Sequence, residues 1–335
     1  MNLKKILVTG GTGYIGSHMV VELINAGFTP VIIDNLVNSK ESSLDGIQKI
    51  TGVRPEFHKI DLCDKENLEK LFRENDFELT IHFAGLKAVE ESIRKSLEYY
   101  KNNIGGTINL LECMQKYGCK KIIFSSSATV YGKQDVPYLT EKMTTGLGIT
   151  NPYGETKFMI EQILKDLCVS DKDFSAVALR YFNPVGNHES GLIGEDPEGI
   201  PNNLMPIIMK VARGEMDELK VYGNDYDTRD GSCVRDFIHV MDLVRGHLAA
   251  MNKMTPGFTA YNLGTGRGTT VLEMIEAFQK VSGKKLPYKI VDRRDGDLAE
   301  IYADASLANT ELGWKTELTI EDAMRDTLAF LNKTK

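Results

Sequence analysis

The chain has 335 residues, 42% of them hydrophobic, so it can bury a full core and accommodate a second, smaller domain. Its formal net charge of -7 argues against a general nucleic-acid or membrane surface, although a local basic pocket for a phosphorylated small molecule is compatible with it. The five cysteines show no C-x-x-C spacing and the six histidines form no metal-ligand motif, so we expect reduced thiols and no metal site. The first apolar run is interrupted at once by glycines, so we expect neither a signal peptide nor a membrane span, and a cytoplasmic protein.

The first two predicted elements are a short apolar strand at residues 5–8 and an amphipathic helix at residues 15–26. The turn between them carries Gly10, Gly13 and Gly16 at a regular spacing. Such glycines permit a tight turn, let the backbone approach a pyrophosphate, and let the helix pack close to the strand, while its N-terminal N–H groups face the anion. A glycine cluster can also make an ordinary turn, but its place between a strand and a helix favours a dinucleotide-binding βαβ unit.

A second apolar run, residues 30–33, ends in Asp34, eighteen residues after Gly16. A carboxylate at this place can accept hydrogen bonds from the ribose hydroxyls of an adenosine. A 2'-phosphate would instead meet a like charge, and residues 35–38 contain no arginine to offset it. The sequence therefore favours NAD over NADP as the cofactor.

Strands and helices continue to alternate, which predicts a parallel sheet. Further strands are expected at residues 56–60, 80–83 and 120–124, and further helices at residues 64–74, 92–117 and 152–169. The helix at 92–117 has a soft spot at its two adjacent glycines, 105 and 106. Asp61, which follows the third strand, either caps the next helix or touches the adenine. Ala84 and Gly85 follow the fourth strand, where small residues leave room for a cofactor across the strand ends.

The alternation stops near residue 183, where glycine, proline and asparagine become frequent through residue 203, as in loops that leave a sheet. We therefore predict a Rossmann-type α/β fold with a doubly wound parallel sheet and a smaller mixed α/β substrate-binding domain. The NAD-binding domain is expected to comprise residues 1–182 and about 236–265. The smaller, substrate-binding domain is expected to comprise residues 183–235 and about 266–335.

Residues 151–157 contain the candidate catalytic pair. Asn151 can cap a helix and Pro152 suits its first turn, which puts Tyr153 and Lys157 one turn apart on the same face. A phenol near a helix N-terminus, an ammonium and a positive nicotinamide ring should have its pKa lowered well below ~10, so that Tyr153 can act as a base near neutral pH. Tyr-x-x-x-Lys is also a common pair on helix surfaces. Here it follows a dinucleotide turn and a serine cluster, in which Ser127 is the candidate hydroxyl that bridges a substrate oxygen to Tyr153.

Five stretches carry specific motifs. They are Gly-Gly-Thr-Gly-Tyr-Ile-Gly-Ser-His at 10–18, His-Phe-Ala-Gly-Leu-Lys-Ala-Val at 82–89, Ser-Ser-Ser-Ala-Thr-Val-Tyr-Gly at 125–132, Arg-Tyr-Phe-Asn-Pro-Val-Gly at 180–186 and Gly-Ile-Pro-Asn-Asn-Leu-Met-Pro at 199–206. With these motifs the sequence resembles, over essentially its whole length, the extended short-chain dehydrogenase/reductase family and within it the UDP-hexose 4-epimerases.

The resemblance implies a reaction cycle without net redox change. Tyr153, assisted by Ser127, takes the proton of the sugar 4'-hydroxyl while C4' gives its hydride to a tightly bound NAD. The resulting 4-keto sugar swings about the diphosphate linkage, and the same NADH returns the hydride to the opposite face. The expected activity is the interconversion of UDP-glucose and UDP-galactose in galactose metabolism.

The resemblance also implies two sets of contacts. Cofactor contacts are implied for Gly10, Gly13, Tyr14, Ile15, Gly16, Asp34, Asn35, Asp61, Leu62, Phe83, Ala84, Gly85, Lys87, Asn102, Ser125, Tyr153, Lys157 and Phe182. Substrate contacts are implied for Lys87, Ser127, Tyr153, Asn183, Asn202, Asn203, Leu204, Lys220, Val221, Tyr222, Arg235, Arg294, Asp297 and Ile301. Within the second set, Arg235 and Arg294 should clamp the phosphates, a task that suits guanidinium groups, although either alone could be a solvated surface charge. Phe182 could otherwise be a plain core residue.

Ile301 departs from one form of the family. Its position beside the 2'-substituent of the hexose carries a bulky tyrosine in some members and a small residue in others. Isoleucine is smaller than tyrosine but stiff at χ1, so it cannot swing aside cheaply. We expect efficient turnover of UDP-glucose and UDP-galactose and weaker activity on the N-acetylated pair, UDP-GlcNAc and UDP-GalNAc.

Two other functions compete with epimerisation. A sugar-nucleotide 4,6-dehydratase would begin with the same oxidation, but such relatives carry an acidic pair directly after the active-site hydroxyl, where this chain has Ala128 and Thr129. An NAD-sensing regulator on the same fold would be free to lose Tyr153 or Lys157, and both are present.

The helix at 152–169 has an apolar arc wider than packing on one sheet requires. Together with the helix at 92–117 it could form half of a two-fold four-helix bundle, as in the family that the sequence resembles. A homodimer is therefore expected, and the competing interpretation is a thicker monomer core.

Overall fold

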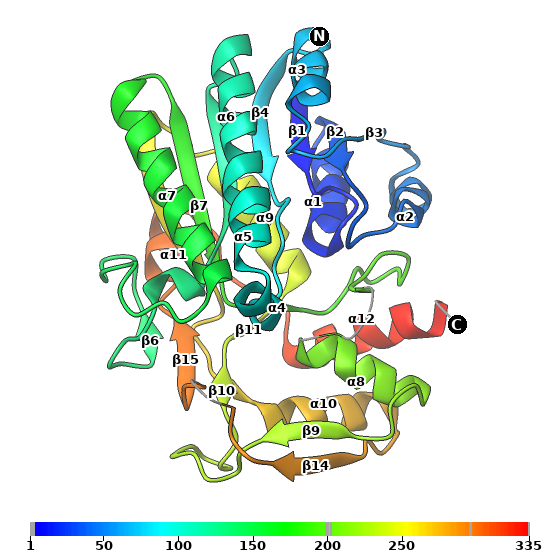
Figure 1. Cartoon of the computed structure of the whole chain (residues 1–335). Coiled ribbons are helices and arrows are strands. Elements are labelled where there is room, and N and C mark those ends of the chain that lie inside the picture. The colour runs from blue at the N-terminus through cyan, green and yellow to red at the C-terminus, as the bar shows by residue number, and fades with distance from the viewer. Residues whose placement is uncertain (1–3, 198–200, 202, 295–296, 334–335) are drawn as a thin grey trace.

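The computed structural model describes residues 4–197, 201, 203–294 and 297–333 (Figure 1). These residues contain a seven-stranded parallel sheet in the order β12-β7-β5-β4-β1-β2-β3. The strands are β1 (Lys5–Thr9), β2 (Thr29–Asp34), β3 (Glu56–Lys59), β4 (Phe77–His82), β5 (Lys121–Ser127), β7 (Ser175–Tyr181) and β12 (Gly257–Leu263). The order confirms the Rossmann-type doubly wound sheet, and it reverses between β1 and β4.

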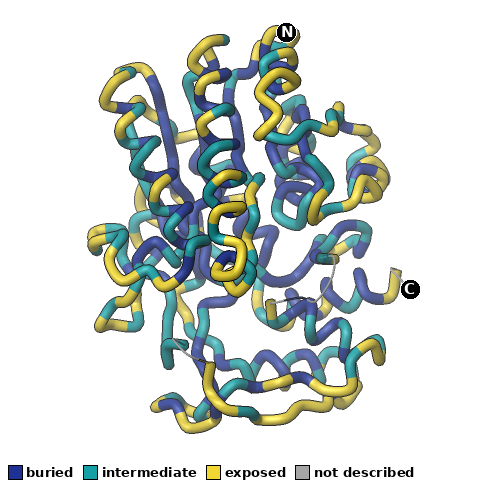
Figure 2. The backbone as a smooth tube through the Cα atoms, in the orientation of Figure 1, coloured by how far each residue is buried: buried dark blue, intermediate teal, exposed yellow. Residues whose placement is uncertain are grey.

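Helices cover both faces of this sheet (Figure 1). One face packs against α3 (Lys65–Glu74), α6 (Gly106–Tyr117) and α7 (Pro152–Ser170), and the other against α1 (Tyr14–Asn25) and α9 (Val240–Met251), with α2 (Ser42–Thr51) beside α1. Because both faces are covered, most residues of the central strands are buried, and the backbone tube there is dark blue in Figure 2.

The segment expected to form one helix at 92–117 is divided, so that prediction was wrong. It contains α4 (Val89–Arg94), α5 (Ser96–Tyr99), the π-helical turn η1 (Tyr100–Gly105) and then α6. The first break lies at Lys95, whose backbone leaves the helical region with φ -124° and ψ 42°. Within η1 the buried Asn103 side chain donates to the Leu86 carbonyl and accepts from the Leu86 N–H. This pair ties the wider turn to the loop after β4, and such turns are frequent at functional sites.

A smaller mixed α/β region lies beyond the carboxyl ends of the sheet strands (Figure 1). A four-stranded sheet has the order β13 (Thr269–Thr270), β10 (Val234–Arg235), β15 (Glu300–Ala303) and β6 (Tyr138–Leu139). Two further pairs are β8 (Asn183–Val185) with β11 (Phe237–His239), and β9 (Leu219–Tyr222) with β14 (Tyr288–Val291). Helices α8 (Leu204–Arg213), α10 (Val271–Ser282) and α12 (Ile320–Lys333) enclose a separate core.

One late segment packs back on the large sheet. Helix α11 (Ser306–Leu312) contacts β12 and α9, and the Trp314 Nε1–H donates to the Asp242 carbonyl at 2.9 Å. Residues near 305–314, which the sequence analysis grouped with the smaller domain, thus share the core of the large sheet. No helix within the described ranges is both long and apolar enough to cross a membrane.

Helix α7 begins at a side-chain cap that also orients the catalytic face. The Asn151 Oδ1 accepts a hydrogen bond from the Gly154 N–H at 2.8 Å. We predict that Asn151→Ala lowers the free energy of unfolding by about 1 kcal/mol, whereas Asn151→Ser, which keeps an acceptor, costs less. Denaturant unfolding followed by circular dichroism measures both. Equal losses in the two variants would mean that the cap bond is not what Asn151 contributes.

Candidate active site

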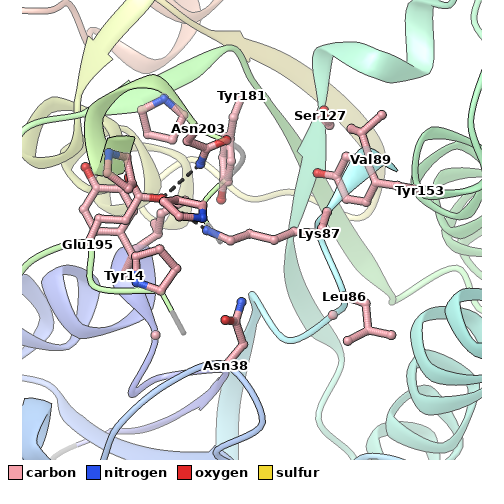
Figure 3. Close-up of a pocket in the computed structure, with 18 of the residues that line it drawn as sticks. Tyr14, Asn38, Leu86, Lys87, Val89, Ser127, Tyr153, Tyr181, Glu195 and Asn203 are labelled. Carbon is pink, nitrogen blue, oxygen red and sulfur yellow. Dashed lines mark hydrogen bonds and ion pairs between the residues drawn. The ribbon is translucent and has the colours of Figure 1, made fainter. Parts of the chain in front are cut away.

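A large cleft runs along the carboxyl ends of the strands, between the sheet and the smaller region (Figure 3). It includes the point where the strand order reverses between β1 and β4, which is where open α/β sheets bind ligands. Its volume is about 2260 Å³. Sites for one drug-sized ligand usually measure ~300–1,000 Å³, so this cleft has room for two extended molecules.

Most of the residues assigned to a cofactor or a substrate line this cleft. From the large sheet and its loops they are Gly10, Gly13, Tyr14, Ile15, Gly16, Asp34, Asn35, Asp61, Leu62, Phe83, Ala84, Gly85, Lys87, Asn102, Ser125, Ser127, Tyr153, Lys157 and Phe182. From the opposite side they are Asn183, Asn203, Leu204, Lys220, Tyr222, Arg235, Arg294, Asp297 and Ile301.

The side chain of Val221 does not line the cleft, so the expected place of Val221 beside the base stays a prediction. Side chains alternate along β9, and Val221 points into the core of the smaller region while Lys220 and Tyr222 reach the cleft. Asn202 lies outside the described residues.

The glycine-rich turn has no space for side chains. A Cβ on Gly16 would lie 2.2 Å from the Gly10 carbonyl oxygen, and one on Gly10 would lie 2.8 Å from the Ala84 nitrogen. The backbone of Gly10 also has φ +70°, a conformation that favours glycine. Helix α1 starts here from Gly13 without a side-chain cap, so its first N–H groups face the cleft. This cradle fits the pyrophosphate of a dinucleotide.

Asp34 organises the loop that follows β2. Its carboxylate accepts hydrogen bonds from the Leu36 N–H and the Ser39 hydroxyl, both at 2.9 Å, and from the Thr12 N–H at 3.3 Å. Leu36 has φ 64°, which is rare for a leucine, and the bond to Asp34 holds it there. The loop is therefore fixed in a strained form at the edge where an adenosine ribose would lie.

Asp61 faces the cleft and does not cap the next helix. Its Oδ2 accepts from the Asn35 amide at 2.9 Å, which joins the ends of β2 and β3. The cap of α3 is Asp64, which accepts from the Asn67 N–H at 3.2 Å. Of the two interpretations of Asp61, helix capping was therefore wrong.

The catalytic candidates come from the first turns of α7 and the end of β5. The Lys157 Nζ donates to the Ser125 carbonyl at 2.6 Å and lies 5.8 Å from the centre of the Tyr153 ring. Tyr153 and Ser127 lie near each other in Figure 3, and the Ser127 side chain favours the ionised form of the Tyr153 phenol, which lowers its pKa. The Ser127 Oγ accepts from the Thr129 hydroxyl at 3.0 Å, which fixes its direction.

Burial dominates the titration of this pair in the chain alone. Burial raises the pKa of Tyr153, and the hydrogen bond with Ser127 offsets only part of that rise. Burial also lowers the pKa of Lys157 to about 7. The expected lowering of the Tyr153 pKa included the charge of a bound nicotinamide ring and so stays a prediction; in the chain alone, desolvation is the largest effect and raises this pKa.

Tyr181 is a cleft residue that the sequence analysis missed. It ends β7 directly beside Ser127 in the sheet register, and its hydroxyl is hydrogen-bonded to the Nε2 of the buried His247. The ring of Phe83 lies 5.1 Å from that imidazole. The position of Tyr181 at a strand end could have indicated a cleft residue. Its partner His247 lies on α9, too distant in sequence to form a local motif with it.

Glu195 is a second missed residue, and it joins three parts of the cleft wall. It is buried, and its Oε1 accepts from the Asn203 amide at 3.0 Å and from the Lys87 ammonium at 3.4 Å. Figure 3 shows Lys87 reaching across the cleft toward this pair, beside Tyr14. The carboxylate therefore orients two of the expected contact residues at once.

The two arginines are held by different partners. Arg235 donates to the Leu298 carbonyl at 2.8 Å and to the Asp297 carboxylate at 3.2 Å, and the Arg294 guanidinium lies 3.9 Å from the centre of the Tyr222 ring. Both line the cleft, and Arg235 is next to Ile301 in the sheet register. Asp297, for which a substrate contact was expected, is thus paired with Arg235.

Comparisons with known proteins agree with this geometry. The model of the family described as GDP-mannose 4,6 dehydratase matches residues 7–327. The UDP-glucose 4-epimerases of Bacillus subtilis and Homo sapiens are each 54% identical to the chain, over 323 and 331 residues that cover 96% of this chain and 95% of either protein. The structure of UDP-glucose 4-epimerase from Bifidobacterium longum in complex with NAD+ and UDP is 51% identical, covers 98% of both chains and has a TM-score of 0.95. The chain belongs to the UDP-glucose 4-epimerase family.

Proposed function

We propose that this chain catalyses NAD-dependent epimerisation at C4' of a UDP-hexose, interconverting UDP-glucose and UDP-galactose. The observation that carries the proposal is the meeting of Tyr153, Lys157 and Ser127 between a dinucleotide cradle and a pair of arginines, in one cleft. The reaction requires a redox cofactor that stays bound, which the dinucleotide cradle can hold. It also requires that the nucleotide be bound beside the reacting sugar, which the two arginines can do.

The residues of the chain handle the proton. Deprotonated Tyr153 takes the proton of the 4'-hydroxyl, and the Ser127 hydroxyl binds the same oxygen. NAD, when bound at the cradle, supplies the two-electron oxidation of C4' and then its reversal. When the 4-keto group is reduced from the other face, Tyr153 gives the proton back to the oxygen, so that the enzyme ends as it began.

To act as a base near neutral pH, Tyr153 must first be deprotonated, so its pKa must be lowered. Positive charge near the phenol must provide that lowering. Lys157 is the cation of the chain that lies beside Tyr153, and burial lowers the pKa of that lysine to about 7. A bound oxidised nicotinamide adds a second positive charge. We infer that the phenolate forms chiefly when this cofactor is present.

The substrate contacts divide between a fixed and a moving part. Arg235 and Arg294 are proposed to hold the diphosphate, and Asn183, Asn203 and Leu204 with the β9 residues to hold the sugar phosphate and the uridine. When the nucleotide is fixed, the hexose remains free to rotate between the two hydride transfers. The proposed division of the chain into an NAD domain and a UDP-sugar domain follows the two walls of the cleft.

Dehydration is the nearest alternative, because it begins with the same oxidation. Elimination of water would require an acid and a base beside C5' and C6'. The positions after Ser127 carry Ala128 and Thr129 instead, and the Thr129 hydroxyl is bonded to Ser127. Epimerisation is therefore the better match.

The first functional prediction concerns Tyr153. Tyr153→Phe should reduce conversion of UDP-galactose to UDP-glucose below about 1% of the wild-type rate, because it removes only the group that moves the proton. Purified protein is incubated with UDP-galactose without added NAD, and the products are identified by chromatography. UDP and NAD should still bind the variant, which calorimetry checks. Turnover above a few per cent would overturn the assignment of the base.

A second prediction concerns the choice of sugar at Ile301, whose side chain lines the cleft and packs with the cluster around Phe182. Overpacking costs ~1–3 kcal/mol, or about one to two decades in rate. Ile301→Tyr should suppress epimerisation of UDP-N-acetylgalactosamine by that factor while sparing UDP-galactose, and Ile301→Ala should improve the former. Ratios of kcat/KM for the two substrates measure this. Equal loss of both activities in the tyrosine variant would mean that Ile301 does not select the sugar.

We further propose that the protein acts in the cytoplasm, in galactose metabolism, as a homodimer. Large apolar side chains are exposed on adjacent helices, with Leu97 of α5 82% exposed, Ile93 of α4 61% and Ile108 of α6 41%. Met159 on α7, which packs against α4 and α5, adds to this surface. A second copy of the same face would cover it as a four-helix bundle.

Substitution at this surface tests the assembly. Leu97→Asp should convert a particle of twice the chain mass to one of the single chain mass, because it would bury a charge in the interface. Light scattering at micromolar concentration measures the mass, with Leu147→Asp, exposed outside these helices, as the control. A wild-type protein of single chain mass would refute the homodimer.

A further inference from the structure

A buried ion pair lies one helical turn beyond the catalytic lysine. Tyr153, Lys157 and Glu161 follow one another at intervals of four along α7, so their side chains form one stripe. Arg180, on β7, binds the Glu161 carboxylate at both oxygens, with Nε to Oε1 at 3.0 Å and Nη2 to Oε2 at 2.7 Å. Glu161 is 0% and Arg180 3% exposed, so neither charge is in contact with water.

The same stripe meets three consecutive serines at the end of β5. Ser127 is near Tyr153 and lowers the pKa of its phenol, the Ser125 carbonyl accepts from Lys157, and the Ser126 hydroxyl donates to the Glu161 Oε1 at 2.6 Å. The third of these contacts involves neither catalytic candidate. It nevertheless sets the position of the strand end that carries the other two.

Glu161 has a second possible partner in Lys157. Residues four apart on a helix are close enough to form an ion pair, and the buried ammonium of Lys157 has a carbonyl, not a carboxylate, as its acceptor. Arg180 and Ser126 instead bind the Glu161 carboxylate. The remaining Arg180 nitrogen, Nη1, donates to the Tyr131 hydroxyl at 2.9 Å, and that hydroxyl donates to the Asn262 Oδ1 at 2.7 Å, so the arginine is fixed from both sides.

We propose that Arg180 is a positioning residue that keeps the Glu161 carboxylate from pairing with Lys157, so that the charge of the lysine acts on Tyr153. Arg180 touches neither the cleft nor the reacting atoms. It acts through the charge that it neutralises. The inference rests on the proposed function only in assigning Tyr153 as the base.

Other titratable groups around the stripe do not supply this charge balance. From the neighbouring elements they are His82 of β4, Tyr181 of β7, Tyr131 of η2 (Ala128–Tyr131), Glu141, and the Glu91–Lys95 pair at α4. Burial lowers the pKa of His82 to about 3 and raises the pKa of Tyr131 to about 12. Near neutral pH the three tyrosine and histidine side chains are uncharged. Glu141 is bound to the Asn262 N–H, and the Glu91–Lys95 pair balances itself.

The proposal makes the two single substitutions act in opposite directions. Arg180→Met leaves an unpaired carboxylate near Lys157, which should raise the pKa of Tyr153 and move the acid limb of the kcat profile to higher pH. Glu161→Gln leaves an unpaired guanidinium, which should move it to lower pH. A unit charge two helical turns away, ~12 Å, shifts a pKa by about one unit at an effective dielectric constant of ~20.

The double variant separates charge from packing. Arg180→Met/Glu161→Gln removes both charges, keeps an acceptor for Ser126 and fills the arginine's volume, so its profile should return to within a few tenths of a pH unit of wild type. Lys120→Met is the matched control, because Lys120 pairs with Asp171 at 2.5 Å across the other end of the same strand and helix. Its profile should not move.

The measurements are pH profiles of kcat for UDP-galactose and an ultraviolet titration of the phenolate in protein with NAD and UDP, referenced to Tyr153→Phe. The titration needs no turnover, so a failure of the proposed activity and a failure of this inference are distinguishable. Opposite shifts that cancel in the double variant support the proposal. Unchanged midpoints, shifts in one direction, or a double variant worse than either single one would overturn it.

Discussion

The proposed active site depends on the contact between α7 and the carboxyl end of β5. Tyr153 and Lys157 are set by the helix, Ser125 and Ser127 by the strand, and the two elements are joined by buried hydrogen bonds instead of exposed ones. Because the helix starts at the Asn151 cap, beside the cleft, the first turns of α7 reach the strand ends. A shift of α7 along the strand would separate all of these groups together.

The same contact explains why the titration of the site is unusual. Burial raises the pKa of Tyr153 and lowers the pKa of Lys157 to about 7, so burial weakens the charged form of both groups. A site of this kind holds its charges only while each has a partner. The bidentate Arg180–Glu161 pair and the Lys157 bond to a carbonyl meet that condition in different ways. Breaking a buried pair costs more than the pair itself contributes to stability.

The sequence was sufficient where function depends on local spacing. Gly10 and Gly16, Asp34, and the interval between Tyr153 and Lys157 are all readable within one βαβ unit or one helical turn, and the alternation of elements predicted the parallel sheet. It was insufficient where the partner is distant. Glu195, Tyr181 and the contact of Glu161 with Arg180 are defined by pairs that only the fold brings together.

One error came from a local rule that another interaction overrode, and one expectation meets an opposing effect in the chain alone. Periodicity predicted one helix at 92–117, but the buried Asn103 binds the loop after β4 and accompanies a π-helical turn. The helix terminus, the neighbouring ammonium and a bound nicotinamide ring predict a low pKa for Tyr153, and this stays a prediction; in the chain alone, desolvation raises that pKa. Both opposing effects depend on burial, which a single sequence records only indirectly.

The edge strand β12 has a consequence for biosynthesis. It pairs with β7 along its whole length, from Gly257 beside Ser175 to Leu263 beside Tyr181, yet it follows β7 only after part of the smaller region and α9 have been made. As the chain leaves the ribosome, β7 therefore presents an open apolar edge while residues 182–256 are translated. The sheet can be completed only after that interval, so the nascent chain needs protection from edge-to-edge association until β12 emerges.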